Sequence, residues 1–198
     1  MQHDASARGN KPCIGRLIYL MGPSGAGKDS LIDASRAQLL AAGAEVARRV
    51  ITRSAEAKGE DAVSVSVEEF ARLRATGALA LDWQANGLAY GIPASVDDWL
   101  GEGRHVLVNG SRAYLRQARA RYPDLIAIQL EVDPRILQQR LLARGREPVR
   151  QIEERLERGR QLQVTEDDSV HILDNSGSLK DAAQGLFRIL REQGVQVR

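Results

Sequence analysis

LIYLMGPSGAGKDS, residues 17–30, is the stretch of sequence that decides the fold. An apolar strand runs into G-x-x-x-x-G-K, and a helical pattern begins directly after it. In this context glycines let backbone N–H groups close around phosphate oxygens, and the positive end of the helix dipole faces them. The stretch predicts a P-loop that binds a nucleoside triphosphate. The predicted contacts are Gly22, Pro23, Ser24, Gly25, Ala26, Gly27, Lys28, Asp29 and Ser30.

Lys28 adds a mobile cation for the β and γ phosphates. Only four of the 28 basic residues are lysines, so a lysine at this position is informative. The residue after it is normally Ser or Thr, whose hydroxyl reaches Mg²⁺, but here it is Asp29, followed by Ser30. A carboxylate is a good Mg²⁺ ligand, and its charge beside phosphates is tolerable when the metal lies between them. Asp29 and Ser30 are therefore candidate metal ligands. The alternative for Asp29 is an ordinary acidic residue stabilised by the helix dipole.

Composition sets limits on the class of protein. The 198 residues suit one α/β domain with a modest insertion, and the net charge of +2 gives no argument for a nucleic-acid partner. A lone cysteine, Cys13, excludes a disulfide framework. No apolar run approaches membrane length, and residues 1–14 are expected to form a mobile tail without a signal-peptide core. These features predict a cytoplasmic protein, monomer or homodimer, with small-molecule partners and no nucleic acid or membrane contact.

Strand-like and helix-like segments alternate along the chain, which predicts a parallel five-stranded sheet flanked by helices. Strands are expected over 16–21, 44–51, 104–109, 125–132 and 170–173, with helices from 28 to about 42 and near the C-terminus. Residues 54–100 differ in character, with a capping-box spacing that starts at Ser66 and a hairpin signal at Asn86-Gly87. They predict an inserted α/β lobe that binds an acceptor.

The order of several motifs resembles guanylate kinase over nearly the whole chain. After the P-loop come Ile51-Thr52-Arg53, Gly59-Glu60, Asp82-Trp83, Tyr90-Gly91 and Arg144-Gly145-Arg146. The resemblance implies one kinase domain over 15–198, with a core of 15–53 and 101–198, the lobe of 54–100 and a helical lid at about 140–160. It places acceptor binding on Arg53, Asp82 and Tyr90. It places the catalytic lid arginines at Arg140, Arg144 and Arg155.

Several positions depart from the guanylate kinase pattern. Glu56 stands where a second phosphate-binding arginine is expected, Ala62 aligns with a phosphate-binding tyrosine, and Ile92 with a small hydroxyl residue. Asn109 replaces an acid of the third strand. A guanine site that lacks so many partners would bind its base poorly.

A narrower family fits better. GPSGAGKDS at 22–30 and VLVNGSR at 106–112 look like ribose 1,5-bisphosphate phosphokinase of the bacterial phosphonate (carbon–phosphorus lyase) pathway. This resemblance spans about residues 16–192. It implies that ATP, with Mg²⁺, phosphorylates ribose 1,5-bisphosphate to 5-phosphoribosyl 1-diphosphate.

The acceptor in such a reaction is a phosphate oxygen, which needs no catalytic base, so positioning and charge neutralisation would carry catalysis. We expect Lys28 and the lid arginines to neutralise the transferring group. Asn109 and Arg112 follow the third strand at the carboxyl edge, where ligands bind in open α/β sheets, and join the acceptor site. Asn175, after the fifth strand, is a candidate ATP contact.

Other functions remain as alternatives. A guanylate (nucleoside monophosphate) kinase is disfavoured by the departures above. A non-catalytic guanylate-kinase-like binding module would typically lose the P-loop, which is intact here. A nucleotide-switch GTPase would need an Asn-Lys-x-Asp motif, which the chain lacks.

Overall fold

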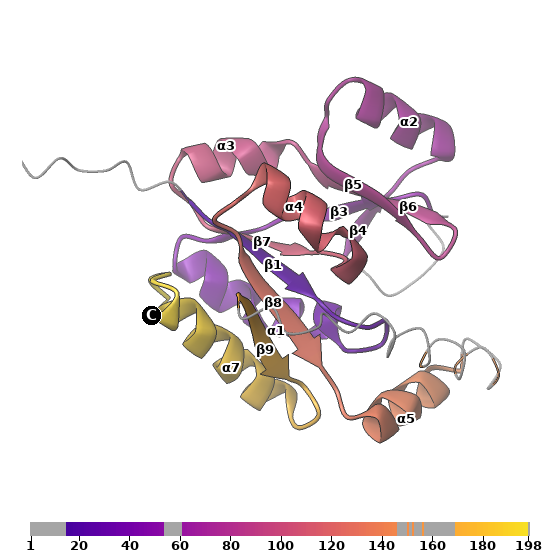
Figure 1. Cartoon of the computed structure of the whole chain (residues 1–198), viewed down its shortest axis with the longest axis vertical. Helices are drawn as coiled ribbons and strands as arrows, with labels where there is room; N and C mark the ends of the chain where they lie inside the picture. Colours follow the sequence, from indigo (N-terminus) through magenta and orange to yellow (C-terminus); the bar gives the residue numbers. More distant parts are fainter. Residues whose placement is uncertain are drawn as a thin grey trace, which may run out of the picture.

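The structure, a computed structural model, describes residues 15–53, 61–145, 150, 152, 156 and 169–197. A five-stranded parallel sheet lies between helices, and a second sheet of four strands extends from one end of it (Figure 1). The expected α/β fold with a parallel five-stranded sheet is confirmed.

The main sheet has the strand order β2-β7-β1-β8-β9. Its strands are β1 (Leu17–Met21), β2 (Glu45–Val46), β7 (Val106–Asn109), β8 (Ile126–Glu131) and β9 (Val170–Asp174). The helices around it are α1 (Lys28–Ala41), α3 (Ser95–Gly101), α4 (Leu115–Arg121), α5 (Pro134–Arg144) and α7 (Leu179–Glu192), with a 3₁₀ turn, η1 (Arg112–Tyr114), before α4.

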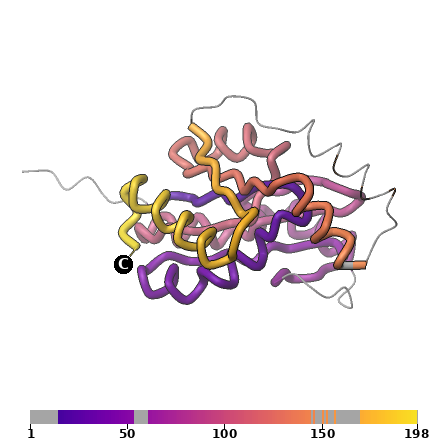
Figure 2. Tube along the Cα trace, turned by 90° about the horizontal axis from the view of Figure 1, so that it is seen from below, coloured from indigo at the N-terminus to yellow at the C-terminus, as the bar shows by residue number. Residues whose placement is uncertain are grey.

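β1 lies at the centre of the sheet, and every one of its residues is buried. Because side chains alternate along a strand, Ile18 and Leu20 pack with α1 and α7, whereas Tyr19 and Met21 pack with α3 and α4. Figure 2 shows α1 and α4 on opposite sides of the sheet. This packing on both faces holds the end of β1 rigidly where the P-loop begins.

The second sheet has the order β4-β3-β6-β5 and carries one helix. Its elements are β3 (Arg49–Ile51), β4 (Ala62–Ser64), α2 (Val67–Ala75), β5 (Leu79–Ala85) and β6 (Leu88–Pro93). The Ser66 hydroxyl accepts a hydrogen bond from the Glu69 N–H at 3.1 Å, as the capping-box spacing predicted. Asn86 and Gly87 adopt φ values of 51° and 75°, which suit the tight turn between β5 and β6.

The expectation of one strand over 44–51 is wrong. β2 pairs with β7 in the main sheet, whereas β3 pairs with β4 and β6 in the second sheet. The apolar pattern continues through both strands, and it carries no signal for the change of partner at Ala47 and Arg48. The split leaves Arg49 at the junction of the two sheets.

α5 begins with Pro134 in its first turn, and the Asp133 carboxylate accepts hydrogen bonds from the N–H groups of Arg135 and Ile136. It ends at Gly145, which has a left-handed φ of 60°. The expected tail, residues 54–60, Arg155 and most of the expected lid lie outside the described residues. Among the helices that the structure describes, none is long and apolar enough to cross a membrane.

Candidate active site

The P-loop joins β1 to α1 and depends on glycine at its last position. Gly27 has a φ of 87°, and a Cβ atom added there would lie 2.8 Å from the side-chain nitrogen of Asn175. That nitrogen donates a hydrogen bond to the carbonyl of Ala26 at 2.6 Å. Asn175 is buried and reaches the P-loop from the end of β9. The structure therefore places Asn175 beneath the loop, where it holds the loop backbone.

Lys28 turns back over the start of the loop. Its Nζ donates to the carbonyls of Gly22 at 2.9 Å and Pro23 at 3.0 Å. Both carbonyls belong to the first two residues of the loop, so the ammonium group stays at the mouth of the site, where phosphate oxygens would arrive. The arrangement fits the predicted role of Lys28 as a phosphate-binding cation.

Asp29 connects three elements. Its Oδ1 accepts a hydrogen bond from Asn109 Nδ2 at 2.7 Å and lies 3.5 Å from Arg49 Nη2. Asn109 ends β7 and is buried, so its amide fixes the carboxylate from below. The acid at the start of α1 and the amide at the end of β7 thus form one polar unit beside the P-loop.

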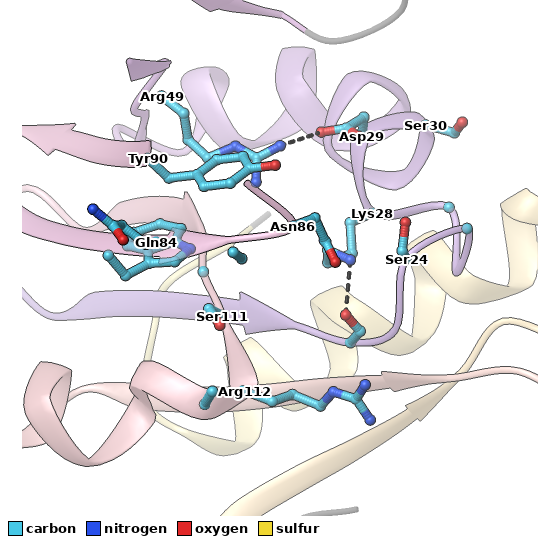
Figure 3. Close-up of a pocket in the computed structure, with 17 residues that line it drawn as sticks. Ser24, Lys28, Asp29, Ser30, Arg49, Gln84, Asn86, Tyr90, Ser111 and Arg112 are labelled. Carbon is cyan, nitrogen blue, oxygen red and sulfur yellow. Dashed lines mark hydrogen bonds and ion pairs between the residues drawn. The ribbon is translucent and has the colours of Figure 1, made fainter. Parts of the chain in front are cut away.

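A cavity of about 360 Å³ lies between the P-loop, the β5–β6 hairpin and the segment after β7 (Figure 3). Its P-loop wall includes Gly22, Ser24, Gly25, Gly27, Lys28, Asp29 and Ser30. Its other walls include Arg49, Trp83, Gln84, Ala85, Asn86, Tyr90, Gly110, Ser111, Arg112 and Ala113. The cavity therefore brings the nucleotide-binding loop and the inserted lobe together, as a site for two substrates requires.

Tyr19 fixes the segment after β7. Its hydroxyl donates to the Ser111 carbonyl and accepts from the Ser111 N–H, both at 2.9 Å. A Cβ atom on Gly110 would lie 2.2 Å from the Tyr19 ring, so only glycine allows this approach. Arg112 follows directly. Burial lowers the pKa of its guanidinium, and the negative charge of Glu131 partly opposes this effect. A partly buried cation at the cavity wall favours an anionic ligand.

Tyr90 forms an aromatic wall of the cavity. Its ring stacks on Trp83 with a centroid distance of 5.6 Å and an interplanar angle of 7°. The ring centroids of Trp83 and Tyr114 lie 5.7 Å apart, and this contact links the hairpin to η1. The Tyr90 ring therefore has a fixed orientation, because packing holds it from behind.

Six predicted acceptor or ATP contacts do not line the cavity: Pro23, Ala26, Arg53, Asp82, Asn109 and Asn175. Asp82 forms an ion pair with Arg74 of α2 at 2.6 Å, on the side of β5 toward that helix. Asn109 reaches the site through Asp29, and Asn175 through the P-loop backbone. Tyr90 and Arg112, by contrast, face the cavity directly (Figure 3).

The predicted lid arginines are only partly described. Arg140 and Arg144 both lie in α5, four residues apart. The pKa of the Asp174 carboxyl is lowered, mainly by hydrogen bonds from the side chain and the backbone of Ser176. The charge of Arg140 makes a smaller contribution in the same direction. Arg140 does not line the cavity. The catalytic role of these arginines stays a prediction.

Eight residues of the cavity wall were missing from the sequence-based site: Arg49, Trp83, Gln84, Ala85, Asn86, Gly110, Ser111 and Ala113. Asn86 was interpreted only as a turn residue, and Ser111 only as part of a family motif. Arg49 was hidden inside an expected strand, where a charged residue beside Arg48 was the one available signal. Gln84 carries no sequence signal of its own.

Comparisons with known proteins identify relatives of the chain. No protein-family model matches the chain. The chain is 58% identical over 179 residues to ribose 1,5-bisphosphate phosphokinase PhnN of Azotobacter vinelandii. The aligned region covers 90% of this chain and 97% of the relative. The chain is also 56% identical over 173 residues to the protein of the same name from Pseudomonas paraeruginosa, covering 87% and 94%.

The crystal structure of guanylate kinase from Anaplasma phagocytophilum is similar in fold. The TM-score is 0.66 at 18% identity, and the match covers 92% of this chain and 88% of that one. This likeness concerns the fold alone. On the sequence identities over nearly the full length of both relatives, the chain belongs to the ribose 1,5-bisphosphate phosphokinase family.

Proposed function

We propose that this protein transfers the γ-phosphoryl group of ATP to the 1-phosphate of ribose 1,5-bisphosphate, giving 5-phosphoribosyl 1-diphosphate and ADP in phosphonate catabolism. One observation of the structure carries the proposal. A single cavity joins the P-loop to two arginines, Arg49 and Arg112, that come from different elements. Two polyanions can meet only where cations offset their repulsion, and this cavity supplies cations on more than one wall. The names of the relatives point to the same reaction.

The chemistry requires positioning more than proton transfer. An oxygen of the 1-phosphate, already anionic at neutral pH, forms a bond to the γ-phosphorus. The bond from that phosphorus to the oxygen bridging it to the β-phosphate breaks, and the electron pair leaves with ADP. Lys28 at the mouth of the loop neutralises the charge that develops on the transferring group, and Arg112 on the facing wall orients the attacking phosphate.

Asp29 and Ser30 would hold a Mg²⁺ ion. Both line the cavity in the first turn of α1, and their oxygens are the ligand type that Mg²⁺ prefers. The hydrogen bond from Asn109 keeps the carboxylate at the cavity wall. A bound Mg²⁺ ion supplies positive charge to the β and γ phosphates. One carboxylate with a hydroxyl suits an ion that takes its other ligands from phosphates and water.

The remaining predicted residues complete the proposal. Tyr90 contacts the acceptor from the lobe. Arg53, just after β3, and Asp82 of β5 also bind the acceptor in this proposal. The domain arrangement that we propose is one kinase domain, and its lid brings Arg140, Arg144 and Arg155 to the triphosphate on closure.

A guanylate kinase is the second candidate, and the site argues against it. Asp82, which the family likeness assigns to acceptor binding, is paired with Arg74 at 2.6 Å. Ile92 has no exposed surface and offers no hydroxyl. Arg49 instead brings a charge to the cavity, which an uncharged base cannot neutralise.

ADP release tests the proposal. The protein is supplied with ATP, Mg²⁺ and either ribose 1,5-bisphosphate or GMP, and Lys28→Ala is compared with Lys180→Ala, a matched change at an exposed position of α7. Turnover with the sugar bisphosphate, lost in Lys28→Ala and retained in Lys180→Ala, is the expected result. Turnover with GMP alone would contradict it.

A further inference from the structure

The proposed acceptor carries phosphates at both ends of its ribose, and only one of them reacts. The reacting 1-phosphate must approach the γ-phosphate near Lys28. The 5-phosphate is held at the other end of the ribose, away from Lys28, and needs a cation of its own. This inference rests on the proposed function and asks which residue of the cavity supplies that cation.

Arg49 lines the same cavity and carries such a charge. It begins β3, at the junction of the two sheets, and its side chain is only 10% exposed. The guanidinium carbon lies 5.5 Å from the centroid of the Tyr90 ring. In Figure 3 Arg49 and Arg112 lie on opposite sides of Lys28, so the two arginines face the cavity from different walls.

The contacts of Arg49 hold its side chain in place and still allow the guanidinium to bind an anionic ligand. The Tyr90 ring, itself stacked on Trp83, attracts the cation and gives it a fixed platform. The contact with Asp29 is 3.5 Å long, at the outer limit of a hydrogen bond. A phosphate can accept two parallel N–H bonds from a guanidinium, a shorter and stronger arrangement than this contact.

We propose that Arg49, supported by Tyr90, binds the 5-phosphate of ribose 1,5-bisphosphate and selects an acceptor that carries a phosphate at its far end. A nucleoside monophosphate would place an uncharged base against Arg49, and the buried cation would lose water without gaining an anion. Arg49 is thus a specificity-determining residue of the acceptor site.

Binding of ribose 5-phosphate tests this assignment without turnover, because that sugar carries only the phosphate in question. Isothermal titration calorimetry compares the wild type with Arg49→Met, Arg49→Lys and Arg48→Met. Arg48 is the matched control, because it precedes Arg49, is 55% exposed and pairs with Asp61. We expect Arg49→Met to weaken binding roughly 10- to 100-fold, Arg49→Lys to weaken it less, and Arg48→Met to leave it unchanged. Equal affinity in the wild type and Arg49→Met, or no binding by the wild type in the millimolar range, would overturn the assignment.

A second measurement separates a binding role from a structural one. ATP affinity and thermal unfolding of Arg49→Lys are measured alongside, since ATP binds at the P-loop and an intact loop reports an intact fold. Loss of ATP affinity equal to the loss of ribose 5-phosphate affinity would mean that Arg49 acts through Asp29, and the assignment would fail.

Kinetics then distinguish failure of this inference from failure of the proposed function. With ribose 1,5-bisphosphate and ribose 1-phosphate as acceptors, Arg49→Met should lower kcat/KM more for the bisphosphate than for the monophosphate. An equal fall for both would refute the 5-phosphate contact. Absence of wild-type turnover with either acceptor would refute the proposed function, and the ribose 5-phosphate titration would still decide whether Arg49 binds a sugar phosphate.

Discussion

Replacing Asp29 with alanine removes the carboxylate that connects α1 with β7 and Arg49. The hydrogen bond from Asn109, at 2.7 Å, joins an amide to a charged group and contributes about 1.5–3 kcal/mol. The Arg49 pair at 3.5 Å has a Coulomb energy of about 5 kcal/mol at an effective dielectric constant near 20. Because the Asp29 side chain is 38% exposed, solvent screening and desolvation reduce the net value to about 1 kcal/mol or less.

We therefore expect Asp29→Ala to lower the free energy of unfolding by about 2–3 kcal/mol, mostly through Asn109. Urea denaturation at neutral pH measures it. Asp33→Ala is the matched control, one turn along α1, 63% exposed and 3.6 Å from Arg36. It should change stability by no more than about 0.5 kcal/mol.

A double-mutant cycle decides whether the polar unit exists. Asp29→Ala and Asn109→Ala should be coupled by about 1–2 kcal/mol, because each substitution leaves the remaining side chain without its hydrogen-bond partner. If the two losses add to within about 0.5 kcal/mol, the Asn109 hydrogen bond does not stabilise the protein and the reasoning is wrong.

The isosteric change Asp29→Asn tests the metal role of the same residue. Removing one negative charge beside the triphosphate should by itself favour ATP binding. If Asp29 holds Mg²⁺, the Mg²⁺ concentration at half-maximal rate should instead rise at least about tenfold, the effect seen even for residues that only orient a metal ligand. Tighter ATP binding with an unchanged Mg²⁺ dependence would show that Asp29 is structural.

Three further changes address the supports of the site. Gly27→Ala should lower ATP affinity at least tenfold by calorimetry and stability by about 1–3 kcal/mol, whereas Gly43→Ala, with a similar positive φ of 76° but nothing within 4 Å, should leave ATP affinity unchanged. Tyr19→Phe removes both hydrogen bonds to Ser111 and should raise the KM of the acceptor without changing that of ATP, as steady-state kinetics would report. Burial, and then the charge of Arg16, lower the pKa of His105 in the folded protein. Neutral His105 therefore contributes to stability above its pKa in the unfolded chain, about 6.5, and this contribution is lost as the pH falls through its pKa in the folded protein. Between pH 7 and 5 the Tm of His105→Asn should therefore fall less than that of the wild type.

Much of the fold was predictable because its signals are local. The P-loop needs glycines between a strand and a helix, and Gly27 meets that need with a φ of 87°. The Asn86-Gly87 turn follows equally from the backbone preferences of two adjacent residues. Burial on both faces of β1 follows from its unbroken apolar run. In each case neighbouring residues carry the information.

The missed features depend on partners far away in the sequence. β2 and β3 follow one another with only Ala47 and Arg48 between them, yet they pair with strands of different sheets. Periodicity shows which residues are buried, but it does not show which strand lies beside them. Arg49 became visible as a site residue only because this change of sheet turns it toward the P-loop.

The two residues that look anomalous in the sequence explain one another in the structure. A carboxylate directly after the P-loop lysine would repel phosphates, and a buried arginine in a strand would lack a counter-charge. Asp29 and Arg49 lie 3.5 Å apart, so each offsets the other at the edge of the cavity. A substrate phosphate that pairs with Arg49 weakens the hold of Arg49 on Asp29, and the carboxylate then becomes available to a metal. Acceptor binding and metal binding should therefore favour each other, and ribose 5-phosphate should tighten Mg²⁺-dependent ATP binding in the wild type but not in Arg49→Met.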